Sequence, residues 1–120
     1  MFGIGKKIEI QKMDINDVYD IYIKDPDHHM IICVDEVKNY DDRHIDGSEC
    51  FPLRLFKTFQ EYYPEKDVTY YVYSLNAALS EKAAKELVKQ GYHVYDLGSF
   101  VQYKGIEDGL KVKKKKRRKK

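Results

Sequence analysis

A serine, Ser74, stands where a strand is expected to pass through a short loop into a helix. Residues 68–73 are β-branched and aromatic, which is typical of a strand. The order strand, turn, helix can expose a nucleophilic serine, but that turn requires the pattern Gly-x-Ser-x-Gly. Val72 and Asn76 occupy the two glycine positions. We therefore expect the Ser74 hydroxyl to hydrogen-bond the loop rather than to attack a substrate.

The backbone of the same loop is a candidate anion-binding site. Amide groups at a helix N-terminus favour negative charge without any side chain. Ala77 makes a tight cradle harder wherever φ must be positive. Weak anion binding and no anion binding both stay open. The candidate anion-binding loop consists of Ser74, Leu75, Asn76, Ala77, Ala78, Leu79 and Ser80.

Cysteines and histidines indicate no metal site and no cofactor. The two cysteines, Cys33 and Cys50, are too few for a disulfide framework or a zinc site. Cys33 lies inside the apolar run 30–34 and is expected to be buried. The pair His28-His29 has no Cys or His at a spacing useful for a metal, so we interpret it as a surface turn.

Charge divides the chain into two opposed blocks. The formal net charge is +2, from 22 Lys and Arg against 20 Asp and Glu, and nine of the 22 lie in residues 111–120. The other 13 Lys and Arg residues and all 20 Asp and Glu residues lie in residues 1–110. The body of the chain is therefore acidic. A basic run contacts nucleic acid or an anionic surface by charge alone, without reading sequence. The candidate polyanion-binding residues are Lys113, Lys114, Lys115, Lys116, Arg117, Arg118, Lys119 and Lys120.

Two other interpretations of this basic run stay open: it can be a solubilising tail, or it can fold back on the acidic body. If the source is eukaryotic, such a run can also be a localisation signal. No segment has the ~18 apolar residues of a membrane span. The first ten residues lack the apolar core of a signal peptide, so we expect a cytoplasmic protein.

Strands alternate with helices along the body, which favours an α/β domain with a largely parallel sheet. The helices carry apolar stripes, as at Leu79, Ala83, Leu87 and Val88. Most of the 11 tyrosines fall at core-facing or strand positions, so we expect packing rather than base stacking. Strands are expected at 7–13, 30–34, 68–73 and 93–97, with a very short one near 51, and helices at 14–22, 55–63 and 79–88, with Gly91 ending the last helix.

From Asp14 to Gly105 the sequence resembles rhodanese-like domains. The resemblance rests on a turn and two segments that follow the loop. They are the turn His44-Ile45-Asp46-Gly47 followed by Pro52, the helix Ala83-Ala84-Lys85-Glu86-Leu87 ending in Gly91-Tyr92, and Val94-Tyr95-Asp96-Leu97-Gly98 followed by Phe100 and Tyr103. It implies a three-layer fold, with a central, mostly parallel sheet flanked by helices. We expect this domain over residues 1–108, followed by a disordered basic tail over 109–120.

The departures from the family pattern fall where active members carry their chemistry. The resemblance puts Ser74 at the position of the sulfur-carrying cysteine, and a hydroxyl is neither as acidic nor as nucleophilic as a thiol. Ala77 replaces the loop glycine, and Leu79 replaces an arginine that helps to bind the anionic donor. In the family's Asp-Val-Arg, the last position is Asp35, and the glycine before the histidine is Arg43.

The sequence therefore predicts a rhodanese-like binding or regulatory module without sulfurtransferase activity. Its partners would be a protein, and nucleic acid or an anionic surface through the tail. The alternative is an active sulfurtransferase or phosphatase-like enzyme that uses a non-standard group. In that case Cys50 is the remaining thiol candidate, although the resemblance places it away from the loop, and His44 is the nearest candidate base for Ser74.

Overall fold

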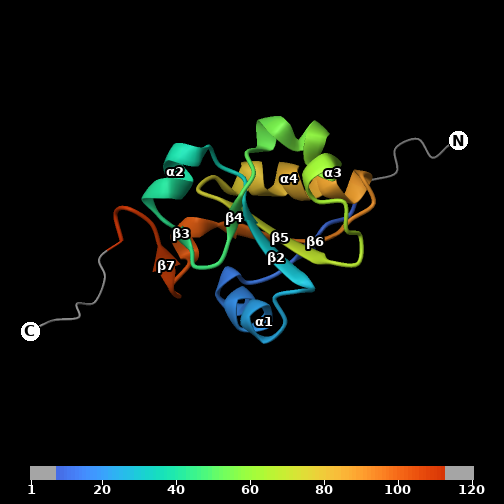
Figure 1. Cartoon of the computed structure of the whole chain (residues 1–120). Helices are drawn as coiled ribbons and strands as arrows, with labels where there is room; N and C mark the ends of the chain where they lie inside the picture. Colours follow the sequence, from blue (N-terminus) through green and yellow to red (C-terminus); the bar gives the residue numbers. More distant parts are fainter. Residues whose placement is uncertain (1–7, 113–120) are drawn as a thin grey trace, which may run out of the picture.

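A five-stranded parallel sheet forms the centre of the protein (Figure 1). The computed structural model describes residues 8–112. The strand order is β1-β6-β5-β2-β4, so β5 lies in the middle and β1 and β4 lie at the edges. The strands are β1 (Gln11–Lys12), β2 (His29–Cys33), β4 (Glu49–Cys50), β5 (Thr69–Ser74) and β6 (His93–Ser99). The predicted parallel sheet is confirmed, and the strand expected near residue 51 is β4.

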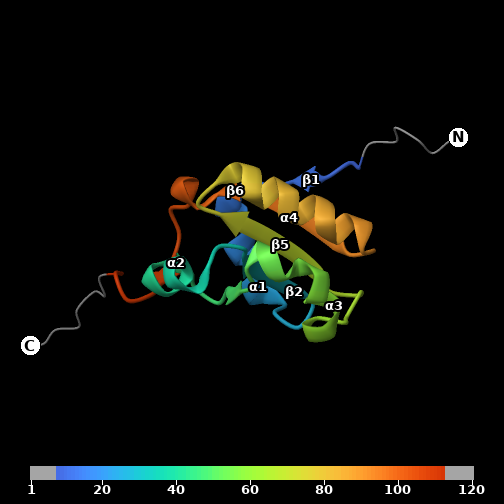
Figure 2. The same cartoon turned by 90° about the horizontal axis from the view of Figure 1, so that it is seen from above.

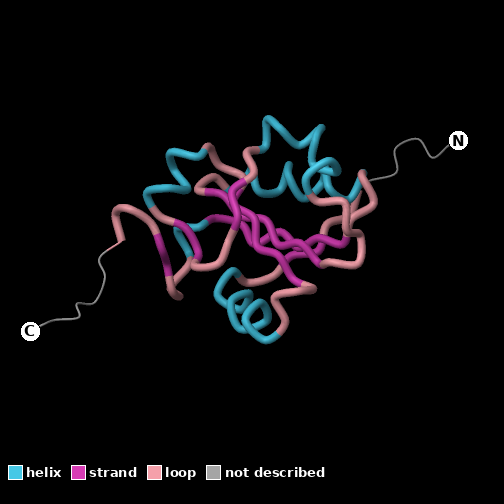
Figure 3. The backbone as a smooth tube through the Cα atoms, in the orientation of Figure 1, coloured by secondary structure: helices cyan, strands magenta, loops and turns pink. Residues whose placement is uncertain are grey.

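Helices cover both faces of this sheet, which confirms the predicted three-layer α/β architecture (Figures 1 and 3). Seen from above, α4 runs along the sheet on the face that it shares with α3 (Figure 2). The opposite face carries α1, which begins after a short 3₁₀ turn that Asp14 caps by accepting from the Asn16 amide. The helices are α1 (Val18–Lys24), α2 (Val37–Asp42), α3 (Phe59–Tyr62) and α4 (Ala77–Lys89), with 3₁₀ turns η1 (Ile15–Asp17), η2 (Leu53–Thr58) and η3 (Phe100–Gln102).

Strand β5 supplies side chains to two separate cores because successive residues of a strand point to opposite faces. Tyr70 and Val72 pack with the α3 and α4 side, among Phe59, Ala83 and Leu87. Tyr71 and Tyr73 pack on the α1 side, among Val18, Ile31 and Leu97. All four side chains are buried. The tyrosines of this strand therefore serve packing.

The ends of the elements follow local sequence signals. α3 ends before Pro64, which cannot continue a helix. Gly91, just after α4, has a φ of 93°, a conformation that favours glycine. There the amide of Tyr92 donates to the Leu87 carbonyl. No helix within residues 8–112 is long and apolar enough to cross a bilayer.

A second, two-stranded sheet holds the C-terminal end of the described chain against α2. β3 (His44–Ile45) pairs antiparallel with β7 (Glu107–Asp108). Beyond β7, the amides of Leu110 and Lys111 donate to the carbonyls of Asp41 and Asp42. Folded structure therefore continues past residue 108, where we expected the tail to begin. The candidate polyanion-binding residues 113–120 lie outside the described residues.

Candidate functional site

Ser74 is the last residue of β5 and is fully buried. Its hydroxyl donates a 2.5 Å hydrogen bond to Oδ1 of Asp35 and accepts one of 2.9 Å from the amide of Asn76. The expected hydrogen bond to the loop is therefore present. Neither partner is a histidine, and the acceptor of the hydroxyl proton is the Asp35 carboxylate.

Asp35 follows β2 directly and places its carboxylate beneath the loop. Because β2 and β5 are parallel neighbours, their carboxyl ends meet at one edge of the sheet. Oδ2 accepts from the Leu75 amide at 2.9 Å and, weakly, from the Cys33 thiol at 3.8 Å. Only 8% of Asp35 is exposed. Within residues 8–112, no Lys, Arg or His lies within ion-pairing distance of this carboxylate.

Most amides of the candidate anion-binding loop, although not that of Ala77, donate hydrogen bonds within the described part of the chain. Leu75 and Asn76 donate to Asp35 and Ser74. Asn76 then caps α4: its Oδ1 accepts from the Ala78 amide at 2.8 Å, and its carbonyl accepts from Leu79 and Ser80. An incoming anion would have to displace these bonds and would meet the Asp35 carboxylate.

Side chains at the far end of the loop lie apart from Ser74. The Ser80 hydroxyl is buried, donates to the Asp96 carboxylate and lies 3.1 Å from the Val72 carbonyl oxygen. Asp96 also accepts from the Gly98 amide. Leu79, at the position where the family resemblance implies an arginine, contributes to a groove between α4 and η2. The structure thus separates Ser74 and Leu79 into different surroundings.

A cavity of about 400 Å³ opens beside Asp35, between α2, η3 and β7. Aromatic and aliphatic side chains make up much of its wall, together with three carboxylates and two cations. Leu75 and Val101, at its edge, are exposed by 48% and 73%. The lining residues are Cys33, Asp35, Asn39, Asp42, Arg43, Tyr73, Leu75, Phe100, Val101, Tyr103, Glu107 and Lys111.

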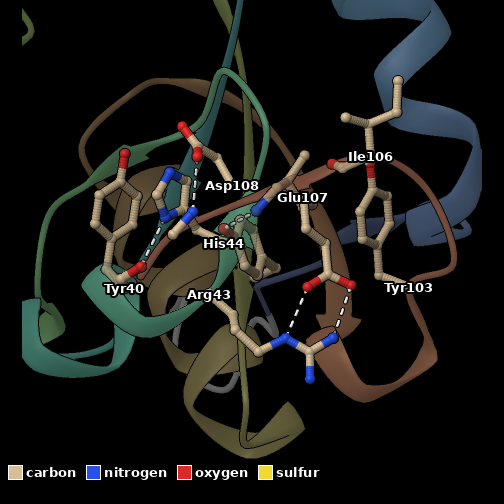
Figure 4. Close-up of polar contacts among 10 residues, drawn as sticks. Tyr40, Arg43, His44, Tyr103, Ile106, Glu107 and Asp108 are labelled. Atoms are coloured by element: carbon tan, nitrogen blue, oxygen red, sulfur yellow. Dashed lines mark hydrogen bonds and ion pairs between the residues drawn. The ribbon is translucent and has the colours of Figure 1, made fainter. Parts of the chain in front are cut away.

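Both cations of the wall are paired with carboxylates of the wall. Arg43 donates through Nε and Nη2 to the two oxygens of Glu107, at 2.7 and 2.9 Å (Figure 4). Nζ of Lys111 lies 3.4 Å from Oδ2 of Asp42. Asp35 is therefore the one carboxylate among the described lining residues that has no cationic partner.

His44, the candidate base, lies in strand β3 of the second sheet. Its Nδ1 lies 2.6 Å from the Tyr40 carbonyl oxygen, so Nδ1 carries a proton and donates (Figure 4). Its ring stacks on Tyr40 with centroids 3.7 Å apart. His28 contacts Asp25, and His29 contacts the Tyr71 hydroxyl. Residues 8–112 contain no cluster of three or more His, Cys, Asp or Glu able to hold a metal ion.

The two thiols are poor nucleophiles at neutral pH. Burial raises the pKa of Cys33 to about 12, and burial raises the pKa of Cys50 to about 11. The Cys50 thiol contacts the Asp35 carbonyl at 3.5 Å. Since the thiolate is the reactive form, the raised pKa disfavours both thiols as nucleophiles at neutral pH.

Comparison with known proteins gives the fold. No protein-family model matches the sequence, and no curated protein matches it. A solved rhodanese with anions from E. coli is similar, with a TM-score of 0.62 and 24% identity over 68% of this chain and 99% of its own. The rhodanese-like domain of an Anabaena protein has a TM-score of 0.72 at 22% identity, over 86% and 82% of the two chains. A rhodanese-related protein from Thermoplasma volcanium has a TM-score of 0.62 at 20% identity, over 77% and 87%. The protein thus has the rhodanese-like fold.

Sequence reasoning missed the contact that Asp35 makes. The resemblance implied an arginine at its position, but the bond to Ser74 was not visible in the sequence. The two residues are 39 positions apart and meet only because β2 and β5 are adjacent.

Proposed function

We propose that this protein is a rhodanese-like binding module that does not transfer sulfur. The observation that carries the proposal is the Ser74–Asp35 pair, which puts a hydroxyl and a buried carboxylate where the family resemblance puts a thiol below an anion cradle. A hydroxyl cannot hold a transferable sulfur as a thiolate does.

Electrostatics at the same point oppose an anionic donor. Two like charges ~4 Å apart near a protein surface repel by about 4 kcal/mol. A sulfur donor such as thiosulfate would approach the Asp35 carboxylate, with the amides of Leu75, Asn76 and Ala78 already engaged. Binding to the carboxyl end of β5 is therefore disfavoured for anions even before the chemical step.

The basic residues 113–120 supply a second, separate contact in this proposal. They would hold the module on nucleic acid or an anionic surface by charge. The folded body would then present its own site to a protein partner.

A thiosulfate-to-cyanide transfer assay tests the central claim. The full chain should form no thiocyanate above a no-protein control, alongside an active rhodanese as positive control. Turnover that Ser74→Ala abolishes would overturn the proposal, because Ser74 would then be a working nucleophile.

A further inference from the structure

We propose that the cavity beside Asp35 binds an arginine side chain of a protein partner, with the Asp35 carboxylate as its counter-ion. This inference rests on the proposed function, because it gives the binding module its ligand class. The Asp35 carboxylate is buried and has no cationic partner within residues 8–112. A buried charge without a partner of opposite sign is costly, and hydrogen bonds offset only part of that cost.

The existing contacts of Asp35 leave room for a cation. Both of its oxygens accept hydrogen bonds, from Ser74, Leu75 and weakly Cys33, which is the arrangement of an ionised carboxylate. A carboxylate offers about four acceptor sites, so Oδ1 keeps one for an incoming N–H group. Oδ1 belongs to a residue of the cavity wall.

The other charges of the wall do not compete for that cation. Glu107 already holds Arg43, and Asp42 already holds Lys111. These two pairs are neutral overall, which leaves the single charge of Asp35 to select the ligand. The cavity is thereby suited to a cation, although the family resemblance implies an anion at this end of the sheet.

The wall also favours arginine over a compact ammonium group. Tyr73, Phe100 and Tyr103 contribute aromatic side chains to the wall, and the Phe100 ring centroid lies 5.4 Å from that of Tyr73 and 5.8 Å from that of Tyr103. A guanidinium group is planar, weakly hydrated and stacks on aromatic faces. At about 400 Å³ the cavity falls in the size range of ligand pockets.

The rim indicates that the arginine arrives on a polypeptide. Leu75 and Val101 flank the opening and are exposed by 48% and 73%. Apolar side chains beside the arginine would cover them and remove that area from water. The fitting partner segment is therefore an arginine between two aliphatic residues.

The test uses the full, isotope-labelled chain and the peptide acetyl-Leu-Arg-Leu-amide, followed by NMR. The amides of Leu75, Phe100 and Val101 should shift. The matching citrulline peptide, which has the same shape without the charge, should bind about 10-fold more weakly or worse. Asp35→Asn should make the two peptides equal. Glu81→Gln, which alters a partly exposed, already paired carboxylate on α4 outside the cavity wall, should keep their difference.

Several results would overturn the inference. Equal binding of the arginine and citrulline peptides to the unaltered chain is one, and it needs no variant to fold. Shifts confined to amides away from the cavity are another, as is tighter binding of thiosulfate at the same amides. Stronger occupation by a peptide of residues 113–120 would assign the cavity to the chain's own segment instead. A chain that neither transfers sulfur nor binds the peptide would keep the proposed function and lose only this inference.

Discussion

The hydroxyl of Ser74 donates to the carboxylate of Asp35 across 2.5 Å, which joins the carboxyl ends of β5 and β2 inside the protein. The bond neutralises no charge, and its acceptor Asp35 also lines the cavity. In the proposed function, the Asp35 carboxylate gives this end of the sheet a negative charge that favours a cation over an anion.

A cysteine at position 74 should be a slow nucleophile as long as Asp35 is present. The neighbouring carboxylate disfavours the thiolate, so the pKa of the thiol in Ser74→Cys should be raised. Adding Asp35→Asn should lower that pKa by about one unit or more, which is ~10-fold more thiolate at neutral pH. The pH dependence of iodoacetamide alkylation measures this.

Ser74→Cys combined with Leu79→Arg is the matched comparison for that experiment. Leu79 lines the other groove, so the added cation should change the pKa of the thiol less than Asp35→Asn does. The unaltered chain controls for Cys33 and Cys50. A larger effect of Leu79→Arg would contradict the separation of the two surroundings.

Ser74→Ala should destabilise the fold by about 1–3 kcal/mol, because a buried carboxylate loses its hydrogen-bond donor. The urea midpoint should fall with an unchanged denaturant slope. Thr58→Ala is the control, since its hydroxyl donates to the Leu55 carbonyl at an exposed position. A loss at Ser74 no greater than that at Thr58 would mean that Asp35 finds another donor at no cost.

Alkaline pH should unfold the protein through its buried phenols and thiols. Burial raises the pKa of Tyr40 and of Tyr103 to about 12, and raises the pKa of Tyr73 far above its usual range. Burial likewise raises the pKa of Cys33 to about 12 and that of Cys50 to about 11. Because the folded state holds these protons more tightly, the contribution of the tyrosines is complete below pH ~9 and that of the cysteines below pH ~7.5, where the unfolded groups are still protonated.

Stability should therefore fall as the pH rises above ~8 through the cysteines and above ~9–10 through the tyrosines, by up to about 1.4 kcal/mol per pH unit for each group titrating only in the unfolded chain. Thermal melts between pH 7 and 11.5 measure this, with phenolate absorbance followed in parallel. The buried tyrosines should stay protonated while the protein is folded. Their share of the phenolate absorbance should therefore appear only when the protein unfolds. A midpoint that stays constant to pH 11.5 would contradict the burial of these groups.

Gly109→Ala should release the end of the described chain from α2. Gly109 has a φ of 132°, and a Cβ there would lie 2.7 Å from the Asp42 carbonyl carbon and 2.8 Å from Cα of Arg43. The left-handed backbone alone costs about 1–2 kcal/mol with a side chain, and the backbone contact adds to that cost. The amides of Leu110 and Lys111 should then exchange faster with solvent.

Gly98→Ala provides the matched control for this release. Gly98 also has a positive φ, 78°, but its Cβ would meet nothing within 4 Å. The control should leave exchange at Leu110 and Lys111 unchanged. Equal exchange in both variants would show that the Asp42 contact does not hold the segment.

The sequence predicted the elements whose signals are local. The β-branched and aromatic content of 68–73 and the apolar stripe of 79–88 placed β5 and α4 within two residues of their observed bounds. α2 was missed because residues 37–42 bury no side chain and carry no apolar stripe. β7 was missed because a two-residue strand exists only through its pairing with β3, more than 60 positions away. The contact between Ser74 and Asp35 was missed for the same reason, because contacts between distant residues produce no periodic pattern in the sequence.

The basic C-terminal residues should confer nucleic-acid binding that depends on salt and not on sequence. Nine of the last ten residues are Lys or Arg. If about five phosphates are contacted, log K should fall against log salt with a slope of about −4 to −5 on duplex DNA. Fluorescence anisotropy with two unrelated duplexes of equal length measures both properties, and the two duplexes should give the same affinity.

Truncation after Val112 tests whether residues 113–120 carry this binding. It keeps Lys111, which bonds to Asp42 through its backbone and its side chain, so the folded part of the chain is not altered. The truncated chain should keep a cooperative melt and lose most of its DNA affinity, since the body that remains is acidic. A negligible salt dependence in the full chain would remove the tether from the proposed function. Full affinity after truncation would place the contact on the folded body, whose acidic residues outnumber its basic ones.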